Sequence, residues 1–372
     1  MLLALLLLAA ACGSDDGSSG TSGSSDGDGG AADEGPAGEG EGERPDLGRM
    51  RLGTGIGTPV LSIATPFVLP AYLGFWEDEG LDVVLAPTAG GSGANIESLE
   101  AGQLELAHFG LATLPKAIDS GIDLVAFFVQ ARKNYHWPVV PLDSPIEEPA
   151  DLVGKTIGVQ SLTAAAVDYG KAYIERAGGD PNSIDFVGVG TGADAGEALK
   201  AGHVDALIMW AEAYIGLENA GYEFREVRDP YLDRMGFQTG TVGLRSFVED
   251  PANRPAVVAL ARGMAKAMVF ATERPDCTVK ALWDLYPESR PTGVPEEEAL
   301  ARGVEEVESR NSFSQPDDDE RWGDATDEEV GIFLEVMSSS LGVDDVWTSE
   351  FIEEINDFDH DAVREMAKDY DC

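Results

Sequence analysis

The stretch Leu99–Ala107 reads LEAGQLELA, and one hundred residues later the stretch Leu199–Leu207 reads LKAGHVDAL. Each has the pattern of a helix that ends at Ala-Gly and leads into a short apolar strand, and glycine commonly follows the last turn of a helix. Two copies of one pattern in a chain of 372 residues predict two units that are built on the same plan.

The likeness continues on the N-terminal side of both stretches. In the first copy we predict strands at 51–56 and 81–86, a helix at 66–79 and a second helix that ends at Ala101. In the second copy we predict strands at 156–160 and 184–189, a helix at 162–177 and a second helix that ends at Ala201. Each copy is therefore expected to form a β-α-β-α-β unit, whose strands make a parallel sheet with right-handed crossovers.

Together the copies predict an α/β protein with two parallel-sheet lobes. One continuous sheet is the alternative, but residues 127–140 have the pattern of an extended crossover strand between two units. Residues 240–244 have the pattern of a strand that crosses back, and the chain after residue 255 is mainly helical in pattern and would flank the first lobe. The predicted domains are 49–140 (lobe 1, first part), 141–240 (lobe 2) and 241–372 (the return to lobe 1 and its C-terminal helices).

The composition supports a folded core and limits the partners. Hydrophobic residues make up 43% of the chain, and 68 Asp and Glu stand against 25 Lys and Arg, which gives a formal net charge of −43. Nucleic acid is excluded as a partner, because the phosphate backbone requires a basic surface.

The N-terminal segment has the pattern of an export signal. The sequence MLLALLLLAAAC is too short to span a bilayer and resembles the apolar part of a signal peptide. It ends in a bacterial lipobox-like sequence, which predicts that Cys12 is lipidated; an ordinary cleaved signal is the alternative. Residues 13–48, rich in Gly, Ser and acidic residues, predict a disordered linker. The protein is therefore expected to be extracytoplasmic, with a lipid anchor in the cell membrane.

The two other cysteines are Cys277 and Cys372. An even pair in an exported protein suggests a disulfide, which would tie the C-terminus to the body of the fold. Two free thiols are the alternative.

Ligands of open α/β sheets bind beyond the carboxyl ends of the strands. The loops at these ends in the two lobes, together with the crossover, offer hydroxyls, aromatic walls and backbone N–H groups at helix N-termini. Such a cleft suits the capture of a small polar molecule. The candidate ligand-binding residues are Thr58, Ser62, Thr65, Gly91, Ser92, Phe109, Gly110, Tyr135, Trp137, Gln160, Ser161, Thr163, Trp210, Glu212 and Tyr214.

Several candidates have two interpretations. Phe109 and Trp210 end equivalent strands, which favours aromatic walls of a cleft over simple core residues. Ser161 and Thr163 have no base nearby, so we interpret them as hydrogen-bond donors to the ligand at a helix N-terminus. Glu212 is the one carboxylate of these loops, and if buried it would need a donor partner and would favour a ligand with an amino group. A Glu at a helix start is the alternative.

Residues for catalysis are scarce. The histidines at 108, 136, 203 and 360 show no metal-ligand spacing and no triad motif, and no phosphate-binding loop with its lysine occurs. We therefore expect no catalytic residue, no metal and no cofactor.

Four segments carry a resemblance to a known family: Leu69–Gly110, Asp143–Val167 (DSPIEEPADLVGKTIGVQSLTAAAV), Ala198–Tyr214 (ALKAGHVDALIMWAEAY) and Thr348–Asp359 (TSEFIEEINDFD). They are similar to substrate-binding proteins of ABC importers of the nitrate, sulfonate, taurine and thiamine-precursor group. The resemblance implies the type II periplasmic binding protein fold. It also implies a monomer that captures a small organic or oxyanion solute between its lobes and docks on a membrane permease when closed.

Two other functions share parts of this pattern. Fungal-type thiamine-pyrimidine synthases resemble the same segments, but such enzymes need a cofactor-bearing Lys, a catalytic His and a Cys cluster, whereas this chain has 3 Cys. A ligand sensor on the cell surface is the third hypothesis, and it would need a receptor in place of a permease.

Overall fold

The computed structural model describes residues 45–372 apart from 56, 58, 89 and 317–320. They belong to one compact unit, Arg44–Cys372. The predicted signal segment, the lipidation site Cys12, nearly all of the predicted linker and the candidate Thr58 therefore lie outside the described residues.

The first sheet contains the strands of the first copy. Its members are β1 (Arg49–Gly53), β2 (Asp82–Ala86), β3 (Leu106–Gly110), β4 (Leu124–Ala131) and β10 (Thr239–Leu244), in the order β2-β1-β3-β10-β4. β1 pairs in parallel with β2 and β3, whereas β10 runs antiparallel to β3 and β4. The returning strand is therefore inserted into the sheet that the first copy begins.

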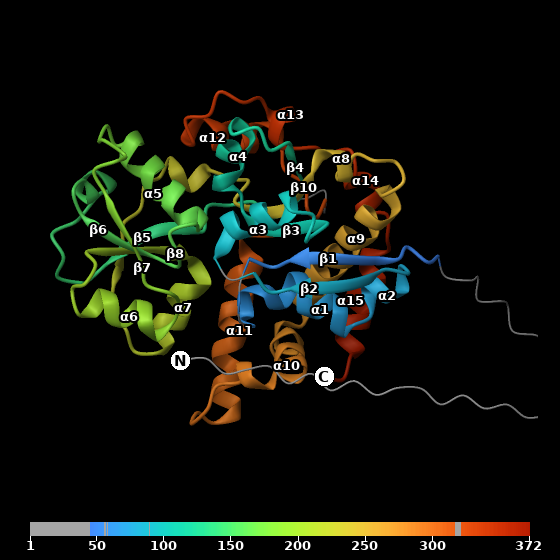
Figure 1. Cartoon of the computed structure of the whole chain (residues 1–372). Helices are drawn as coiled ribbons and strands as arrows, with labels where there is room; N and C mark the ends of the chain where they lie inside the picture. Colours follow the sequence, from blue (N-terminus) through green and yellow to red (C-terminus); the bar gives the residue numbers. More distant parts are fainter. Residues whose placement is uncertain (1–44, 56, 58, 89, 317–320) are drawn as a thin grey trace, which may run out of the picture. The chain divides into compact units, whose positions relative to one another are not determined.

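The second sheet repeats this plan. Its members are β5 (His136–Val140), β6 (Thr156–Val159), β7 (Asp185–Gly188), β8 (Ala206–Trp210) and β9 (Arg225–Glu226), in the order β7-β6-β8-β5-β9. β6 pairs in parallel with β7 and β8, and β5 is antiparallel to β8 and β9. The predicted α/β fold with two lobes is confirmed, and Figure 1 shows the two sheets as separate groups of strands.

The helices that connect the strands follow the prediction with two differences. The helix predicted at 66–79 is divided into several short pieces, and Gly74 adopts a φ of 75°, the left-handed region that glycine tolerates best. The helix predicted from residue 162 begins at Ala165, because Ala164 is still extended. The connecting helices are η1 (Leu61–Ile63), η2 (Ala64–Val68), α1 (Leu69–Tyr72), α2 (Phe75–Asp78), α3 (Gly91–Glu100), η3 (Leu111–Thr113), α4 (Leu114–Asp119), η4 (Pro149–Leu152), α5 (Ala165–Arg176), α6 (Ala193–Lys200), α7 (Ala211–Asn219) and η5 (Leu232–Arg234).

The C-terminal part is mainly helical, as predicted. Its helices are α8 (Arg245–Val248), α9 (Arg254–Glu273), α10 (Pro275–Leu285), η6 (Pro287–Ser289), α11 (Glu296–Ser312), α12 (Asp327–Val336), α13 (Val343–Val346), α14 (Ile352–Ile355) and α15 (His360–Asp369). α9 is long and apolar enough to cross a membrane, but 72% of its apolar window is buried in the fold, as in a core helix.

The chain leaves the first sheet earlier than predicted. Residues 127–140 do not form one crossover strand, because β4 ends at Ala131 and β5 begins at His136 in the second sheet. Between the strands, the Asn134 side chain accepts a hydrogen bond from the N–H of His136 at 3.1 Å, a turn that Asn favours. The first crossing thus lies at residues 132–135, and the predicted boundary at residue 140 falls inside lobe 2.

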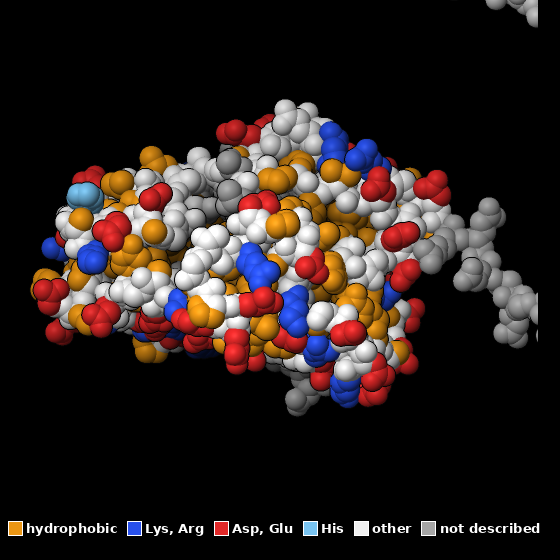
Figure 2. Space-filling view, turned by 90° about the horizontal axis from the view of Figure 1, so that it is seen from below, with side chains coloured by type: hydrophobic (Ala, Val, Ile, Leu, Met, Phe, Trp, Pro, Cys, Tyr) orange, Lys and Arg blue, Asp and Glu red, His pale blue; other side chains and the backbone are white. Residues whose placement is uncertain are grey.

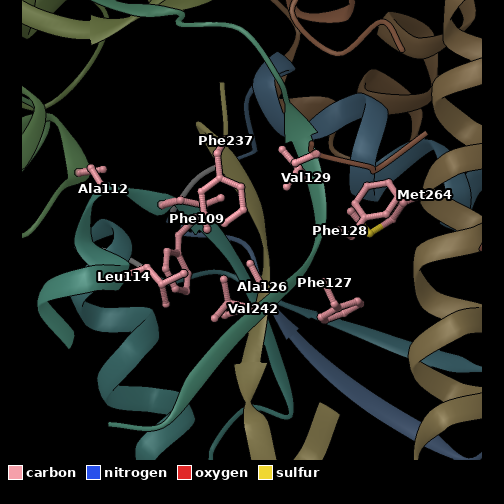
Figure 3. Packing of buried hydrophobic residues seen from close by; sticks show 14 of the residues in the cluster. Phe109, Ala112, Leu114, Ala126, Phe127, Phe128, Val129, Phe237, Val242 and Met264 are labelled. Atoms are coloured by element: carbon pink, nitrogen blue, oxygen red, sulfur yellow. The ribbon is translucent and has the colours of Figure 1, made fainter. Parts of the chain in front are cut away.

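The main hydrophobic core surrounds β4 and β10. All positions of β4 are buried, which fits a strand that is covered on both faces. Figure 3 shows Phe109 of β3, Phe128 of β4, Val242 of β10 and Met264 of α9 within this cluster. Burying a large apolar side chain stabilises a fold by roughly 1.5–3 kcal/mol. The apolar side chains that α9 buries in this cluster therefore stabilise lobe 1.

A disulfide joins Cys277 of α10 to Cys372, and their Cα atoms are 5.5 Å apart. The bond spans a sequence separation of 95, for which the chain-entropy model gives a stabilisation of about 4–5 kcal/mol. Asp276 lies within 4.8 Å of both sulfur atoms, but bonded cysteines offer no thiolate to a metal.

Several basic residues form ion pairs with acidic residues at the surface. Arg262 and Lys266 of α9 both contact Glu79, at 2.9 and 2.7 Å, and Arg254 contacts Glu354 of α14 at 2.6 Å. Figure 2 shows basic side chains set among acidic ones on one face of the molecule. These pairs attach α9 to the elements on either side of it, and being partly exposed each contributes at most about 1 kcal/mol.

Candidate ligand-binding site

A cavity of about 90 Å³ lies between the two sheets, and both lobes contribute to its wall. Lobe 1 contributes the ends of β1 and β3, at Thr54 and Phe109, and lobe 2 contributes the end of β8 at Trp210. The cavity therefore occupies the place that the repeated pattern predicts, beyond the carboxyl ends of the parallel strands. The candidates that line it are Ser62, Gly91, Ser92, Phe109, Gly110, Tyr135, Gln160 and Trp210.

The two serines of lobe 1 differ in what their hydroxyls do. Ser92 donates to the carbonyl of Gly110 at 3.2 Å, so its hydroxyl holds the two loops of lobe 1 together. Ser62 is buried and lines the cavity, and its Oγ has no hydrogen-bond partner among the described residues. A buried hydroxyl without a partner carries a free-energy cost, which a bound polar group would remove.

Lobe 2 presents the N-terminus of α5 to the cavity. Ala164, Ala165 and Ala166 line the wall, and no side chain caps this helix. The first turn of an α-helix has N–H groups without intrahelical partners and carries a partial positive charge. The start of α5 therefore favours hydrogen-bond acceptors.

Ser161 and Thr163 lie outside the cavity wall and contact the opposite lobe instead. The Ser161 hydroxyl donates to the carbonyl of Gly90 at 3.2 Å, and the Thr163 hydroxyl donates to the same oxygen. The N–H of Gly93 donates to the carbonyl of Thr163 at 3.1 Å. The two loops therefore join the lobes at the edge of the cavity.

The backbones of the lobes approach closely at this contact. A Cβ added to Gly110 would lie 2.6 Å from the Cβ of Ala165, and one added to Gly91 would lie 3.3 Å from the Cα of Ala164. Side chains at these two glycines would hold the lobes apart. The structure thus has the lobes in direct contact, a closed arrangement.

Arg310 of α11 brings a positive charge to the cavity, and the sequence analysis did not identify it. Its side chain is buried, with 6% exposure, and donates to Glu212 Oε1 at 3.1 Å and to Gln130 Oε1. The guanidinium carbon lies 4.8 Å from the ring centroid of Tyr135, and Nε has no partner among the described residues. Arg310 thus retains one donor on a cavity-lining group.

Glu212 does not line the cavity, and Arg310 is its donor partner. Burial raises the pKa of this carboxyl, whereas the nearby charge of Arg310 lowers it. The pair also joins the lobes, because Glu212 belongs to α7 of lobe 2 and Arg310 to α11. The negative charge is balanced inside the protein, which removes the reason to expect an amino group on the ligand.

Two buried histidines complete the wall as neutral rings. Burial, followed by the charge of Arg310, lowers the pKa of His108 to about 3 and that of His136 to about 3. His108 Nε2 lies 3.1 Å from Gln130 Oε1, and its Nδ1 lies 3.1 Å from the Thr241 hydroxyl. These rings therefore add no positive charge at neutral pH.

Three further candidates are buried in the interior of the fold and do not line the cavity. The Thr65 hydroxyl donates to Asn311 Oδ1 at 3.3 Å in the core of lobe 1. The Tyr214 hydroxyl accepts from the N–H of Met209 and donates to the carbonyl of Trp137, both at 2.6 Å. Trp137 packs in the core of lobe 2, because successive residues of a strand face opposite sides and His136 occupies the cavity side.

One sequence signal could have identified Arg310. The buried residues of α11 include Ala299, Gly303, Val307 and Arg310, whose spacing of four, four and three places them on one face of the helix. An arginine on the buried face of a helix needs a partner in the interior, and here it finds Glu212. The position of that helix beside the cleft depends on long-range packing, which the pattern does not reveal.

Comparisons with known proteins agree with this architecture. The family model described as "NMT1/THI5 like" matches residues 63–278, which is more than half of the chain. No curated protein matches the chain.

Solved structures share the fold at low sequence identity. A protein from Bordetella bronchiseptica RB50 has a TM-score of 0.65 and 22% identity, covering 83% of this chain and 96% of its own. The ligand-binding component of an ABC-type import system from Staphylococcus aureus, with zinc bound, has a TM-score of 0.57 and 10% identity, covering 83% and 99%. The periplasmic aliphatic sulphonate binding protein SsuA from Escherichia coli has a TM-score of 0.55 and 18% identity, covering 79% and 86%.

Proposed function

Because the chain belongs to the NMT1/THI5-like family and has the two-lobed fold of periplasmic binding proteins, we propose that it is the extracytoplasmic solute-binding component of an ABC importer. The observation that carries the proposal is the cavity between lobes that touch at its edge, with hydrogen-bond donors from both sides. The size and lining of such a cavity suit a small solute.

The proposed mechanism is closure of the lobes around the solute. A ligand that contacts both lobes favours the closed state, because only a difference in affinity between two states can shift their populations. The hinge would consist of the two crossings, at 132–135 and 236–238, where the chain passes between the sheets. The closed form would then dock on a membrane permease.

The donors on the wall favour a solute with an oxygen-rich end. Arg310 Nε and Ser62 Oγ lack partners among the described residues, and α5 begins without a side-chain cap. A carboxylate, sulfonate, nitrate or carbonyl group has acceptors for the N–H groups at the start of α5, and an anionic group would also suit the charge of Arg310. The rings of Phe67, Phe109 and Trp210 on the same wall favour an apolar remainder.

The other parts of the proposal concern where the protein acts. Lipidation of Cys12 would hold a monomer at the cell membrane, and residues 13–48 would act as its flexible leash. An enzyme of the thiamine-pyrimidine synthase type receives no support from the cavity. No Lys or Cys lines it in the described part of the chain, and the pKa values near 3 leave both of its histidines neutral.

A thermal-shift panel on the protein tests the proposal. The panel contains alkyl and aryl sulfonates, carboxylates, nitrate and pyrimidines, each beside a neutral compound of similar shape and beside KCl at the same ionic strength. A ligand at a hundredfold excess over its Kd should add about 2.7 kcal/mol of stability. The proposal fails if no compound with an oxygen-rich end stabilises the protein more than its neutral counterpart does.

A further inference from the structure

A second cavity, which we call the joint cavity, lies where α7 of lobe 2 packs against α11, and Figure 1 shows these helices beside each other. Its volume is about 200 Å³. α7 contributes Gly216 and Asn219, α11 contributes Arg302 and Glu306, and α10 contributes Trp283. None of these residues lines the proposed solute site.

Glu306 is a carboxylate without a counter-charge. It makes no hydrogen bond or ion pair among the described residues, and its Oε1 lies 3.8 Å from the position that a Cβ would take at Gly216. Burial, and then the charges of Glu212 and Glu305, raise the pKa of Glu306 to about 8. An isolated carboxylate among other acids attracts a cation.

The nearest arginines already have partners. Arg302 donates to the carbonyl of Asn219 at 2.8 Å and to Glu298 at 2.5 Å. Arg290, whose guanidinium carbon lies 5.4 Å from the Trp283 ring centroid, pairs with Glu296. Each of these positive charges is balanced by a glutamate, so neither neutralises Glu306, and a cation bound beside Glu306 would favour the loss of its proton.

Most of the remaining wall is apolar, and its other polar residues are Asn219, Ser289 and Arg302. Trp283, Leu61, Val294 and Ala299 line the joint cavity, and Glu306 is the only carboxylate on its wall among the described residues. Hydrated metal cations require several oxygen ligands, which one carboxylate does not supply. An organic cation suits this wall better, because its alkyl groups can be buried against the apolar side chains.

We propose that the joint cavity binds a small organic ammonium ion, with Glu306 as its counter-charge and the Trp283 side of the cavity around its alkyl groups. The occupant contacts α7 of lobe 2 and α11 together, at a place apart from the solute site. The proposal does not depend on which solute the cleft takes.

The test is an NMR titration of the ¹⁵N-labelled protein with tert-butylammonium chloride at a pH just above 8, where Glu306 is largely ionised and the ammonium ion keeps its charge. The indole N–H resonance of Trp283, assigned with Trp283→Phe, reports on the cavity. Parallel titrations use tert-butanol, which has the same shape without the charge, and KCl, which has the charge without the alkyl groups. Glu306→Gln removes the counter-charge, and Glu308→Gln, on the exposed side of the same helix, is the matched control.

We expect saturable shifts with tert-butylammonium in the wild type and in Glu308→Gln, and at least tenfold weaker binding in Glu306→Gln. The proposal is overturned if Glu306→Gln binds as the wild type does, or if tert-butanol binds as tightly. It is also overturned if KCl alone reproduces the shifts, or if the wild type shows no saturable shift.

Discussion

The two β-α-β-α-β units share a topology but bring different chemistry to the cleft. Lobe 1 presents Gly91 and Gly110, which have no side chains, whereas lobe 2 presents Thr163 and the alanines that begin α5. The glycines of lobe 1 leave room for the alanines of lobe 2, so the two surfaces can pack against each other. The loops that meet are not equivalent in the repeat, because those of lobe 1 follow β2 and β3 whereas that of lobe 2 follows β6, the counterpart of β1. The difference teaches that two copies of one plan can meet through different loops, which form complementary halves of one contact.

The lobes also differ in the additional helices that pack against them. The C-terminal helices pack on lobe 1, and α11 extends from them to contact α7 of lobe 2. The buried charge of the cavity, Arg310, comes from α11 and from neither repeat. The repeats therefore supply the walls of the cleft, and the added helix supplies its positive charge.

The largest effect is expected from breaking the charge pair that links this helix to lobe 2. Arg310→Met leaves Glu212 buried without a donor, and loss of one partner of a buried pair costs about 3–5 kcal/mol. Urea unfolding should show this loss. The double variant Arg310→Met with Glu212→Gln should regain most of it, because it removes both charges. A double variant as unstable as the single one would contradict this role of the pair.

The next effect concerns closure of the lobes. Gly110→Ala places a Cβ 2.6 Å from that of Ala165, while the φ of −66° at Gly110 suits alanine. We expect at least a hundredfold loss of affinity for the best compound of the panel, about 2.7 kcal/mol, with little change in the stability of the free protein. Calorimetric titration measures the affinity. Gly331→Ala, at a helical glycine with open space around it, is the control. Wild-type affinity in Gly110→Ala would mean that the lobes need not meet.

The third prediction concerns the joint between α7 and α11. The pKa of Glu306 is raised to about 8 in the folded protein, so its bound proton stabilises the fold below the unfolded pKa near 4.5. That stability is lost as the pH rises through about 8. Between pH 5 and pH 8 the free energy of unfolding of the wild type should fall by about 2 kcal/mol more than that of Glu306→Gln. One pKa unit corresponds to about 1.4 kcal/mol, and the partial exposure of Glu306 to solvent reduces the full difference. Unfolding curves at several pH values measure the difference, and parallel curves for both proteins would refute the prediction.

The smallest effect is expected at the edge of the cleft. Thr163→Val removes one hydroxyl that donates to the carbonyl of Gly90 and keeps the shape of the side chain. We expect roughly fivefold weaker solute binding, about 1 kcal/mol, because a hydrogen bond of the closed state is lost. A loss of a hundredfold or more in the same titration would instead identify Thr163 as a direct ligand contact.

The repeated pattern allowed much of the fold to be predicted. It located the parallel strands within a few residues and placed Phe109 and Trp210 at equivalent strand ends that line the cavity. Such features follow from local sequence, because helix ends and apolar strands have short-range signals. The helix broken at Gly74 shows the limit, since one glycine inside a helical pattern does not reveal its backbone angle.

The rest of the site depends on contacts that the pattern does not contain. The sequence analysis proposed Trp137 as a ligand contact, but its neighbour His136 lines the cavity instead. The sequence alone did not decide which face of β5 would point toward the cavity. Arg310 lies 98 residues from Glu212, and only the packing of α11 on α7 brings them together. Ser161 and Thr163 were expected to face the ligand, but whether they contact a solute or the opposite lobe depends on how far the lobes close.

Closure around a solute is the central claim, and the distance between the lobes tests it most directly. Spin labels at Glu97→Cys on α3 and Glu197→Cys on α6, two exposed and equivalent positions, report that distance by pulsed electron resonance. We predict that the best compound of the panel converts a broad or longer distribution into one narrow, shorter distance, and that Gly110→Ala prevents this change. A distribution that saturating ligand leaves unchanged in the wild type would contradict the account.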